Sequence, residues 1–422
     1  MKIFKFLDRG FQVRKKEAKR NLCVICKGAR NLCGKRKCPL LVKLLSKIKV
    51  KPLIEKKEID GSSPPSVFVG RVGYPKVYVG PLIPPFKGNT EFLDLPEKWY
   101  GRSIMEIVDF RFLLVRGMKR IKVFETEGKI QDMLKELALA KKPVDSDAVF
   151  KKKPLHRISL SSEAQPFGPS APLKDLKIYP SKADWRIEKA YYDTDWKASE
   201  AVYWLYQKNL PVSKIQRAFS VGLLGIEEKR RLVPTRWSIT AVDDIISRKL
   251  VEEIKQFETI DEYRVFENYY LDNRWIILMI PRFWSYESME AWYPGTVWNP
   301  EKYIAIGGDW EGFNGRTSYA SIGGCYYSGR LACAEYLAKE KRQATVIILR
   351  EIHPGYIMPV GVWNVRETVR HALENEPKRF ETLESALSYI AQKLEIPLSA
   401  WIKNSDLLRN LLKQKTLNDF LN

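Results

Sequence analysis

Residues 331–352, LACAEYLAKEKRQATVIILREI, contain both kinds of secondary structure from which we predict the fold. Leu331 to Gln343 has the pattern of a helix, and Thr345 to Ile352 has that of a buried strand. The stretch before them, 307–329, contains seven glycines and is expected to form a mobile loop. The alternation continues toward the N-terminus, with strands predicted at 67–82, 107–115 and 120–124 and helices at 130–141, 197–207 and 241–257. We therefore predict a mixed α/β (α+β) protein.

The helix at 241–257 has the clearest periodicity in the chain. Its apolar residues recur at helical spacing, and Thr240 with Asp243 has the form of a capping box. The segment before it, Val233 to Ser238, is expected to be an exposed loop that leads into a helix N-terminus, where an anion could bind. Against this, Asp243 and Asp244 occupy the first turn of the predicted helix, where they satisfy its dipole and would repel an anion.

The positive charge is concentrated at one end of the chain. The 422 residues suggest two or three domains, and their formal net charge is +22. Residues 1–57 hold 19 Lys and Arg against 3 Asp and Glu. A basic module on a nearly balanced body favours a polyanion as partner, because phosphate neutralisation releases condensed counterions. A solvated basic tail is the alternative interpretation.

Four cysteines in the basic module have the spacing of metal ligands. Cys23 and Cys26 are separated by two residues, and Cys33 and Cys38 by four. Two such pairs can surround one tetrahedral ion, so we predict a structural zinc site, with a redox pair or disulfides as the alternatives. Basic residues within the same loop would then form a cationic surface for phosphates: Lys27, Arg30, Lys35, Arg36 and Lys37. To these we add Arg236 and Trp237 as tentative DNA-binding residues.

The last residues form a peptide pattern after a short amphipathic helix at 405–413. Gln414, Leu417, Phe420 and Leu421 follow the order Gln-x-x-aliphatic-x-x-aromatic-hydrophobic. Offsets of three match one 3₁₀ turn, so the apolar side chains can enter one pocket while the glutamine forms a hydrogen bond. This predicts binding to the replication sliding clamp; a frayed helix end that packs on its own domain is the alternative.

Together these features resemble the archaeal Nre family of DNA repair proteins. The resemblance covers nearly the whole chain and rests on the cysteines, the tail and four further segments: SPPSVFVG at 63–70, GYPK at 73–76, PTRWS at 234–238 and GVWNVRE at 361–367. It implies an N-terminal Nre domain with a metal-binding finger, a smaller C-terminal Nre domain, a role in the response to DNA damage and binding to PCNA, the sliding clamp. It implies no catalytic residues.

We accordingly expect four parts: a zinc-stapled basic module at 1–60, a large central domain at 61–295, a smaller domain at 296–412 and a flexible PCNA-binding tail at 413–422. The expected function is a DNA repair protein that binds DNA and is recruited to PCNA. No apolar run approaches the roughly 18 residues of a membrane span, so a cytoplasmic, nucleoid-associated protein without a membrane partner is expected.

Two other functions stay open. An enzyme acting on DNA could use Glu351 and His353 as acid and base, or hold Mg²⁺ on acidic residues drawn from Asp109, Asp309, Glu311 and Glu351. Aromatic residues make up 12 of the 41 residues at 263–303 and could stack on bases, although core packing is the default for them. A basic zinc module could also bind RNA, but an RNA factor has no use for a sliding clamp.

Overall fold

The computed structural model describes residues 26, 28, 37–156, 165–296, 298–299 and 301–413. The chain forms two compact units, and we call Pro39–Ile246 the N-terminal unit and the part from Ser247 onward the C-terminal unit. Each contains a six-stranded sheet with helices packed on it. The predicted mixed α/β class is confirmed. The predicted boundaries at 60, 295 and 412 stay predictions, and strands on both sides of residue 295 share one sheet.

The sheet of the N-terminal unit has the strand order β1-β5-β6-β4-β3-β2. All neighbours are antiparallel except β4 and β6, which are parallel. The strands are β1 (Glu58–Ser63), β2 (Val67–Val69), β3 (Lys76–Ile83), β4 (Val115–Lys122), β5 (Val144–Phe150) and β6 (Ser170–Ile178). The strand pair predicted around Gly73 is therefore confirmed as β2 and β3.

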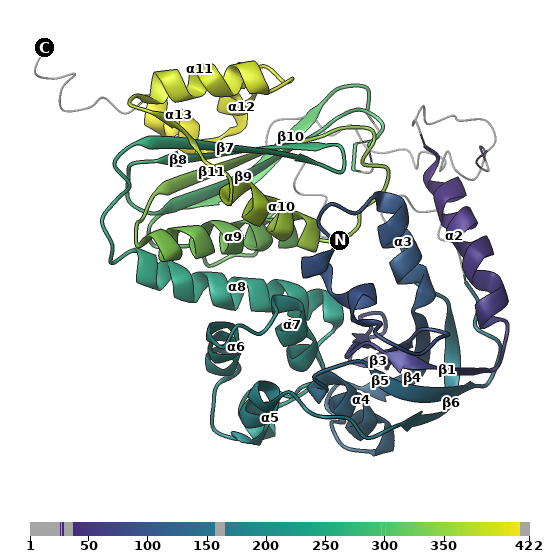
Figure 1. The fold of residues 1–422 in the computed structure, drawn as a ribbon. Helices are drawn as coiled ribbons and strands as arrows, with labels where there is room; N and C mark the ends of the chain where they lie inside the picture. The colour runs from purple at the N-terminus through teal and green to yellow at the C-terminus, as the bar shows by residue number, and fades with distance from the viewer. Residues whose placement is uncertain are drawn as a thin grey trace, which may run out of the picture. The chain divides into compact units, whose positions relative to one another are not determined.

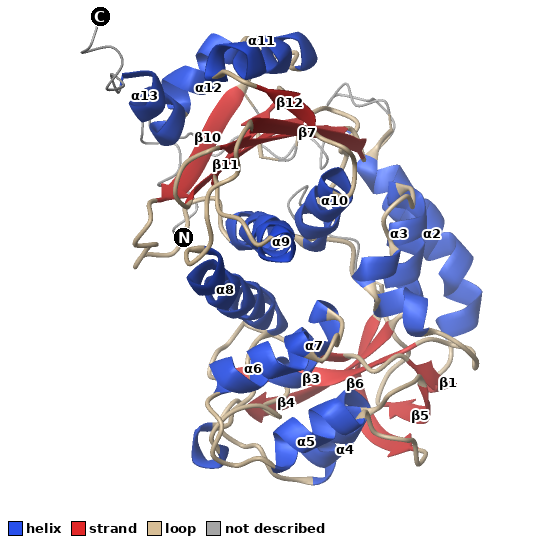
Figure 2. Ribbon diagram, turned by 60° about the vertical axis from the view of Figure 1, so that its left-hand side comes forward, coloured by secondary structure: helices blue, strands red, loops and turns tan. Residues whose placement is uncertain are grey.

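The helices of this unit are α2 (Pro39–Ile54), α3 (Ile104–Leu113), α4 (Lys129–Leu139), α5 (Trp185–Tyr192), α6 (Ala198–Gln207) and α7 (Val212–Ser220), followed by α8 (Thr235–Ile254), which continues beyond Ile246. Short 3₁₀ helices occur at Glu91–Asp94, Pro96–Lys98 and Glu227–Lys229. Helices α2 and α3 lie side by side (Figure 2), while α4 packs against β3 and β6 and α7 packs against β2.

The sheet of the C-terminal unit has the strand order β10-β9-β11-β8-β7-β12. Its strands are β7 (Tyr263–Tyr270), β8 (Asn273–Ile280), β9 (Ser285–Trp292), β10 (Ala305–Glu311), β11 (Thr345–Ile352) and β12 (Lys378–Phe380). Strand β11 is buried along its whole length between β8 and β9, as its apolar sequence predicts.

Helices cover both faces of this second sheet (Figure 1). Helices α9 (Gly324–Glu340) and α10 (Trp363–Leu373) lie on one face, and α11 (Leu383–Lys393), α12 (Leu398–Asn404) and α13 (Asp406–Lys413) lie on the other. The core beneath α11 to α13 includes Leu278, Ile347 and Trp401, all nearly inaccessible to solvent. The predicted helix at 405–413 is thus confirmed as α13.

Three predictions of secondary structure are wrong in part or in whole. Residues 107–113 belong to helix α3 rather than to a strand, because Ser103 and Glu106 form a capping box and Ile107, Val108 and Phe112 bury one helical face. Helix α8 begins at Thr235, directly after Pro234, so the proposed cap at Thr240 does not exist. The glycine-rich stretch 307–329 is not one loop, since it contains most of β10 and the start of α9.

The zinc and clamp predictions fall largely outside the described residues. Cys23, Cys33, Lys27, Arg30, Lys35, Arg36 and the tail 414–422 are not described. Cys26 is buried, and Cys38 directly precedes α2. The structural zinc site and the clamp-binding peptide therefore stay predictions.

Candidate nucleic-acid interface

Two segments that are far apart in the sequence meet at the start of helix α8. The backbone N–H of Val69, at the end of β2, donates to Thr235 Oγ1 over 3.0 Å. In the loop that follows β2, the ring of Tyr74 packs on that of Trp237, with 5.2 Å between centroids and an interplanar angle of 49°. Tyr74 is 42% exposed and Trp237 is 46% exposed. The fold therefore presents an exposed aromatic pair that tertiary contacts hold in place.

The loop that carries Tyr74 is closed by backbone hydrogen bonds. Gly70 N donates to Tyr78 O over 2.7 Å, and Lys76 N donates to Gly73 O over 2.9 Å. Gly73 has a φ of +83°, a left-handed conformation that favours glycine. The Tyr74–Pro75 peptide bond is cis. The two backbone hydrogen bonds and the left-handed Gly73 make the GYPK segment a turn, and its Tyr74 contacts Trp237 of α8.

Cationic side chains continue from this pair onto the outer face of β3 and β4. Alternate strand residues point to opposite faces, so Lys76 and Tyr78 lie on the exposed face while Val77 is buried. Across the antiparallel ladder, Lys76 is opposite Lys122 and Tyr78 is opposite Arg120. The Arg120 guanidinium lies 5.9 Å from the centroid of the Tyr78 ring, within range of a cation–π contact.

The Lys76–Lys122 pair bears most directly on function. Like charges directly opposite each other in a sheet destabilise it. Glu125 gives this pair a weak carboxylate contact, because Glu125 Oε1 lies 3.7 Å from Lys122 Nζ and both side chains are more than half exposed. A phosphate backbone along this face would convert the repulsion into attraction, as counterion release predicts.

The first turn of α8 adds to the same surface. It contains no acidic residue, and Arg236 within it is exposed. Asp243, expected to repel an anion, is instead fully buried two turns further on, where it accepts a hydrogen bond from Gln216 over 3.0 Å. The helix N-terminus therefore contributes its positive end to the surface.

We call these residues the β3–β4–α8 surface: Tyr74, Lys76, Tyr78, Arg120, Lys122, Arg236 and Trp237. Of these, the sequence singled out Arg236 and Trp237 as tentative DNA-binding residues, and the structure places them beside Tyr74. The sequence did not indicate the other five as binding residues: Tyr74, Lys76, Tyr78, Arg120 and Lys122. The signal that could have indicated them is the basic pattern of β4, VRGMKRIK, opposite the Lys and Tyr of β3.

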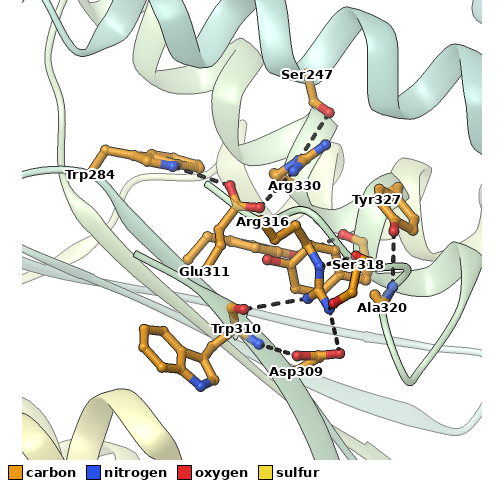
Figure 3. A network of polar contacts seen from close by, with 12 residues as sticks. Ser247, Trp284, Asp309, Trp310, Glu311, Arg316, Ser318, Ala320, Tyr327 and Arg330 are labelled. Carbon is orange, nitrogen blue, oxygen red and sulfur yellow. Dashed lines mark hydrogen bonds and ion pairs between the residues drawn. The ribbon is translucent and has the colours of Figure 1, made fainter. Parts of the chain in front are cut away.

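The carboxylates proposed as magnesium ligands have other partners. Figure 3 shows Asp309 and Glu311 in a network with Arg316 and Arg330. Asp309 Oδ2 lies 2.9 Å from Arg316 Nη2, and Glu311 Oε2 lies 2.7 Å from Arg330 Nη1. Burial alone would raise the pKa of Asp309, but hydrogen bonds from Arg316 and from backbone amides hold it below its ordinary value.

The other two acids have structural contacts as well. Asp109 accepts from Ser46 and pairs with Lys49 Nζ at 2.9 Å. Glu351 is inaccessible and accepts from the backbone N–H groups of Glu395 and Ile396 over 3.2 and 2.8 Å. Within the described ranges there is no group of three His, Cys, Asp or Glu side chains arranged to hold a metal ion. These contacts favour structural roles for the four carboxylates.

Of the twelve aromatic residues at 263–303, five are buried, three are half-buried and four are exposed. Trp275 and Trp284 are each 1% exposed, and Trp292 is 7% exposed. The Trp284 indole N–H donates to Glu311 over 3.3 Å, which ties it to the buried network of Figure 3. The default interpretation of this segment, core packing, therefore holds for these residues.

The fold and the β3–β4–α8 surface define the class as a two-sheet α/β protein with an exposed cationic and aromatic face. The chain belongs to the archaeal Nre family: the model for the archaeal Nre N-terminal region matches residues 32–299, and the model for the C-terminal region matches residues 311–420.

Three named relatives are similar over most of their length. The chain is 45% identical to DNA repair protein NreB of Archaeoglobus fulgidus, over 94% of this chain and all of the relative. It is 38% identical to DNA repair protein NreA of the same organism, over 88% and 94% of the two chains. DNA repair protein NreA of Haloferax volcanii is 34% identical, over 85% and 88%. No solved structure gives a significant match. Among the residues that the structure describes, no helix is long and apolar enough to span a membrane.

Proposed function

We propose that the protein acts in DNA repair and binds DNA through the β3–β4–α8 surface. The names of three similar proteins, all DNA repair proteins, support the repair role. The observation that carries the DNA-binding proposal is the placement of Lys76 opposite Lys122, beside Arg120 on Tyr78. Unbalanced cations together with exposed aromatic rings are what a nucleic-acid backbone and its bases require.

The parts of this surface have separate roles. Lys76, Arg120 and Lys122 neutralise phosphates, which supplies affinity that does not depend on sequence. Tyr74 and Trp237 offer ring faces on which unpaired bases can stack. The surface would therefore bind DNA of many sequences and gain affinity where bases are unpaired.

Two further parts of the proposal rest on the sequence. The four cysteines would hold zinc and present Lys27, Arg30, Lys35, Arg36 and Lys37 to the phosphate backbone, and Lys37 is exposed. The residues Gln414, Leu417, Phe420 and Leu421 would bind PCNA. Tethering to the clamp raises the effective concentration of the protein at DNA without a new DNA contact.

The DNA-binding proposal is tested by removing the cations of β3 and β4 from the β3–β4–α8 surface. In the variant Lys76→Ala/Arg120→Ala/Lys122→Ala, we expect weaker binding of a short labelled duplex, measured by fluorescence anisotropy at several salt concentrations. The slope of log K against log salt is negative, and each lost phosphate contact reduces its magnitude by about 0.9. The loss of three cations should therefore make the slope shallower by about 2 to 3.

A matched variant controls for net charge. The variant Lys339→Ala/Lys378→Ala/Lys403→Ala removes the same charge from exposed positions of the C-terminal unit. We expect its salt slope to equal that of the wild type. Equal slopes for all three proteins would contradict DNA binding at the β3–β4–α8 surface, and tighter binding of structured RNA than of DNA at fixed salt would favour an RNA-binding function instead.

A further inference from the structure

Arg116 lies near the start of β4 and on the same face of the strand as Arg120 and Lys122. Its guanidinium carbon is 4.9 Å from the centroid of the Phe68 ring and 4.8 Å from that of the Phe167 ring. Phe68 comes from β2, the neighbour of β3, and Phe167 comes from the segment that leads into β6. Two rings therefore hold the guanidinium in a fixed orientation.

This guanidinium has no counter-ion among the described residues. Its Nη2 donates one long hydrogen bond, 3.4 Å, to Gly168 O, and its Nε is buried without a hydrogen-bond partner in the described part of the chain. Burial lowers the pKa of Arg116 to about 10, and no carboxylate raises it again. A buried cation without a partner is costly, because stacking on rings replaces little of the lost hydration.

Two lysines of α2 act together with Arg116 on the neighbouring His156. The ring of His156 lies 3.9 Å from that of Phe112, and its Nδ1 is buried without a hydrogen-bond partner. The pKa of His156 is lowered to about 4, by burial first and then by the charges of Lys47, Arg116 and Lys43, against a hydrogen bond to the Phe167 backbone that raises it. Three cations thus act on one small region.

We propose that Arg116 and the basic groups around it form a binding site for a phosphate group. A phosphate group would accept hydrogen bonds from the guanidinium and supply the missing negative charge, and arginine is the side chain best suited to such planar, charge-assisted recognition. Phe167, one of the two rings on the guanidinium, is itself 48% exposed, so the site lies near the protein surface on that side. The inference rests on the proposed DNA binding for its biological ligand, because it places one phosphate of the bound strand at Arg116.

Free phosphate tests the site separately from DNA. Thermal unfolding of the full chain is measured with increasing inorganic phosphate against chloride at the same ionic strength. At a phosphate concentration several times the dissociation constant, phosphate should raise the wild-type Tm by about 2 to 4 °C more than chloride does. The variant Arg116→Met should lose this rise and have a Tm at or above that of the wild type in phosphate-free buffer, since it removes an unpaired buried charge.

The exposed neighbour on the same strand, Lys119, provides the control, and Lys119→Met should keep the phosphate response. A wild type that responds equally to phosphate and chloride, or an Arg116→Met variant that keeps the response, would overturn the proposal. If Arg116→Met does not fold, the Nε–H resonance of Arg116 in the wild type decides instead, because it must shift as phosphate is added.

DNA binding then separates the two proposals. A wild type that responds equally to phosphate and chloride but still binds DNA through the β3–β4–α8 surface would contradict only the phosphate site. A phosphate response at Arg116 in a protein that does not bind DNA would contradict only the proposed function and would identify free phosphate or a phosphorylated small molecule as the ligand.

Discussion

At the scale of single residues, the N-terminal unit keeps several side chains in positions that stability alone does not explain. The large aromatic side chains of Trp237 and Tyr74 are nearly half exposed, and Lys76 lies opposite Lys122. Large exposed aromatic patches usually mark binding sites, and like charges in register weaken a sheet. Both features are consistent with a partner that is anionic and has flat apolar groups.

Replacing Trp237 tests the stacking role. Base–aromatic stacking contributes about 1 to 3 kcal/mol per base, so Trp237→Ala should weaken single-stranded DNA binding by a corresponding factor, while Trp237→Phe should keep most of the affinity. Trp185, which is 57% exposed on α5, provides the control, and Trp185→Ala should bind as the wild type does. Equal losses in Trp237→Ala and Trp185→Ala would contradict a specific role for Trp237. Titration of a short oligonucleotide provides the measurement.

His156 gives the N-terminal unit a pH dependence of known sign. Its pKa is lowered to about 4 from an ordinary value of 6.5, so between these values the unfolded chain binds a proton that the folded protein excludes. Stability should therefore fall as the pH decreases from about 6.5 toward about 4. Urea unfolding at several pH values should show a shallower decrease in His156→Gln, and an unchanged decrease would contradict the assignment.

At the scale of secondary-structure elements, buried carboxylates of the second sheet hold the C-terminal helices. Glu287 on β9 accepts hydrogen bonds from Ser405 and from the backbone N–H groups of Asp406 and Leu407, the latter two over 2.7 and 3.2 Å. It therefore caps α13, the helix that leads into the proposed clamp peptide. Glu351 on β11 holds the segment before α12 in the same way.

The cap of α13 should respond to pH. Burial raises the pKa of Glu287 to about 7, against the hydrogen bonds from Ser405, Asp406 and Leu407. Between its ordinary pKa and about 7, the folded protein keeps a proton that the unfolded chain releases, so stability falls as the pH rises through this window. Glu287→Gln should lack this part of the decrease in the free energy of unfolding between pH 5 and pH 8. An identical decrease in both proteins would contradict the raised pKa of Glu287.

Local patterns predicted several of these elements correctly. The apolar run of β11 and the periodicity of α8 follow from their sequences, because neighbouring residues alone decide such patterns. Helix α3 was missed because its apolar residues also fit a strand, and the capping box of Ser103 and Glu106 decides in favour of the helix. The contact of Tyr74 with Trp237 could not be predicted, since it depends on packing between distant segments.

At the scale of the whole molecule, the proposal assigns contact with DNA to the N-terminal unit and to the cysteine module, and contact with PCNA to the tail. The two sheets differ accordingly. The first has an exposed face of cations and rings, while the second is covered by helices on both faces. The charge of residues 1–57 indicated a polyanion partner from the sequence alone. The cations of β3 and β4 could be recognised as one surface only from the pairing of these strands in the structure.

The tail can be tested independently of DNA binding. In Gln414→Ala/Leu417→Ala/Phe420→Ala, we expect loss of binding to PCNA in calorimetry, because the hydrogen bond and the apolar side chains of the peptide are removed together. Affinity for DNA should be unchanged. Retained PCNA binding in this variant would contradict the assignment of the tail, and a parallel change of Lys415 and Asn418 to Ala controls for the substitutions themselves.

The zinc site predicts a metal content of one ion per chain. Cys23→Ser/Cys26→Ser should abolish it, because two of the four sulfur ligands are lost, whereas Cys325→Ser should leave it unchanged. Elemental analysis of the purified protein measures the content. Zinc-free wild-type protein, or zinc retained in the double variant, would contradict the four-cysteine site.

Photochemical cross-linking identifies the residues that DNA contacts, and it therefore tests whether DNA lies on the β3–β4–α8 surface. Full-length protein is irradiated with a bromodeoxyuridine-substituted oligonucleotide, and the cross-linked residues are identified by mass spectrometry. We predict cross-links at Tyr74, Tyr78 and Trp237, and their loss when unlabelled DNA competes. Cross-links confined to the C-terminal unit, with none at these three residues, would contradict the claim.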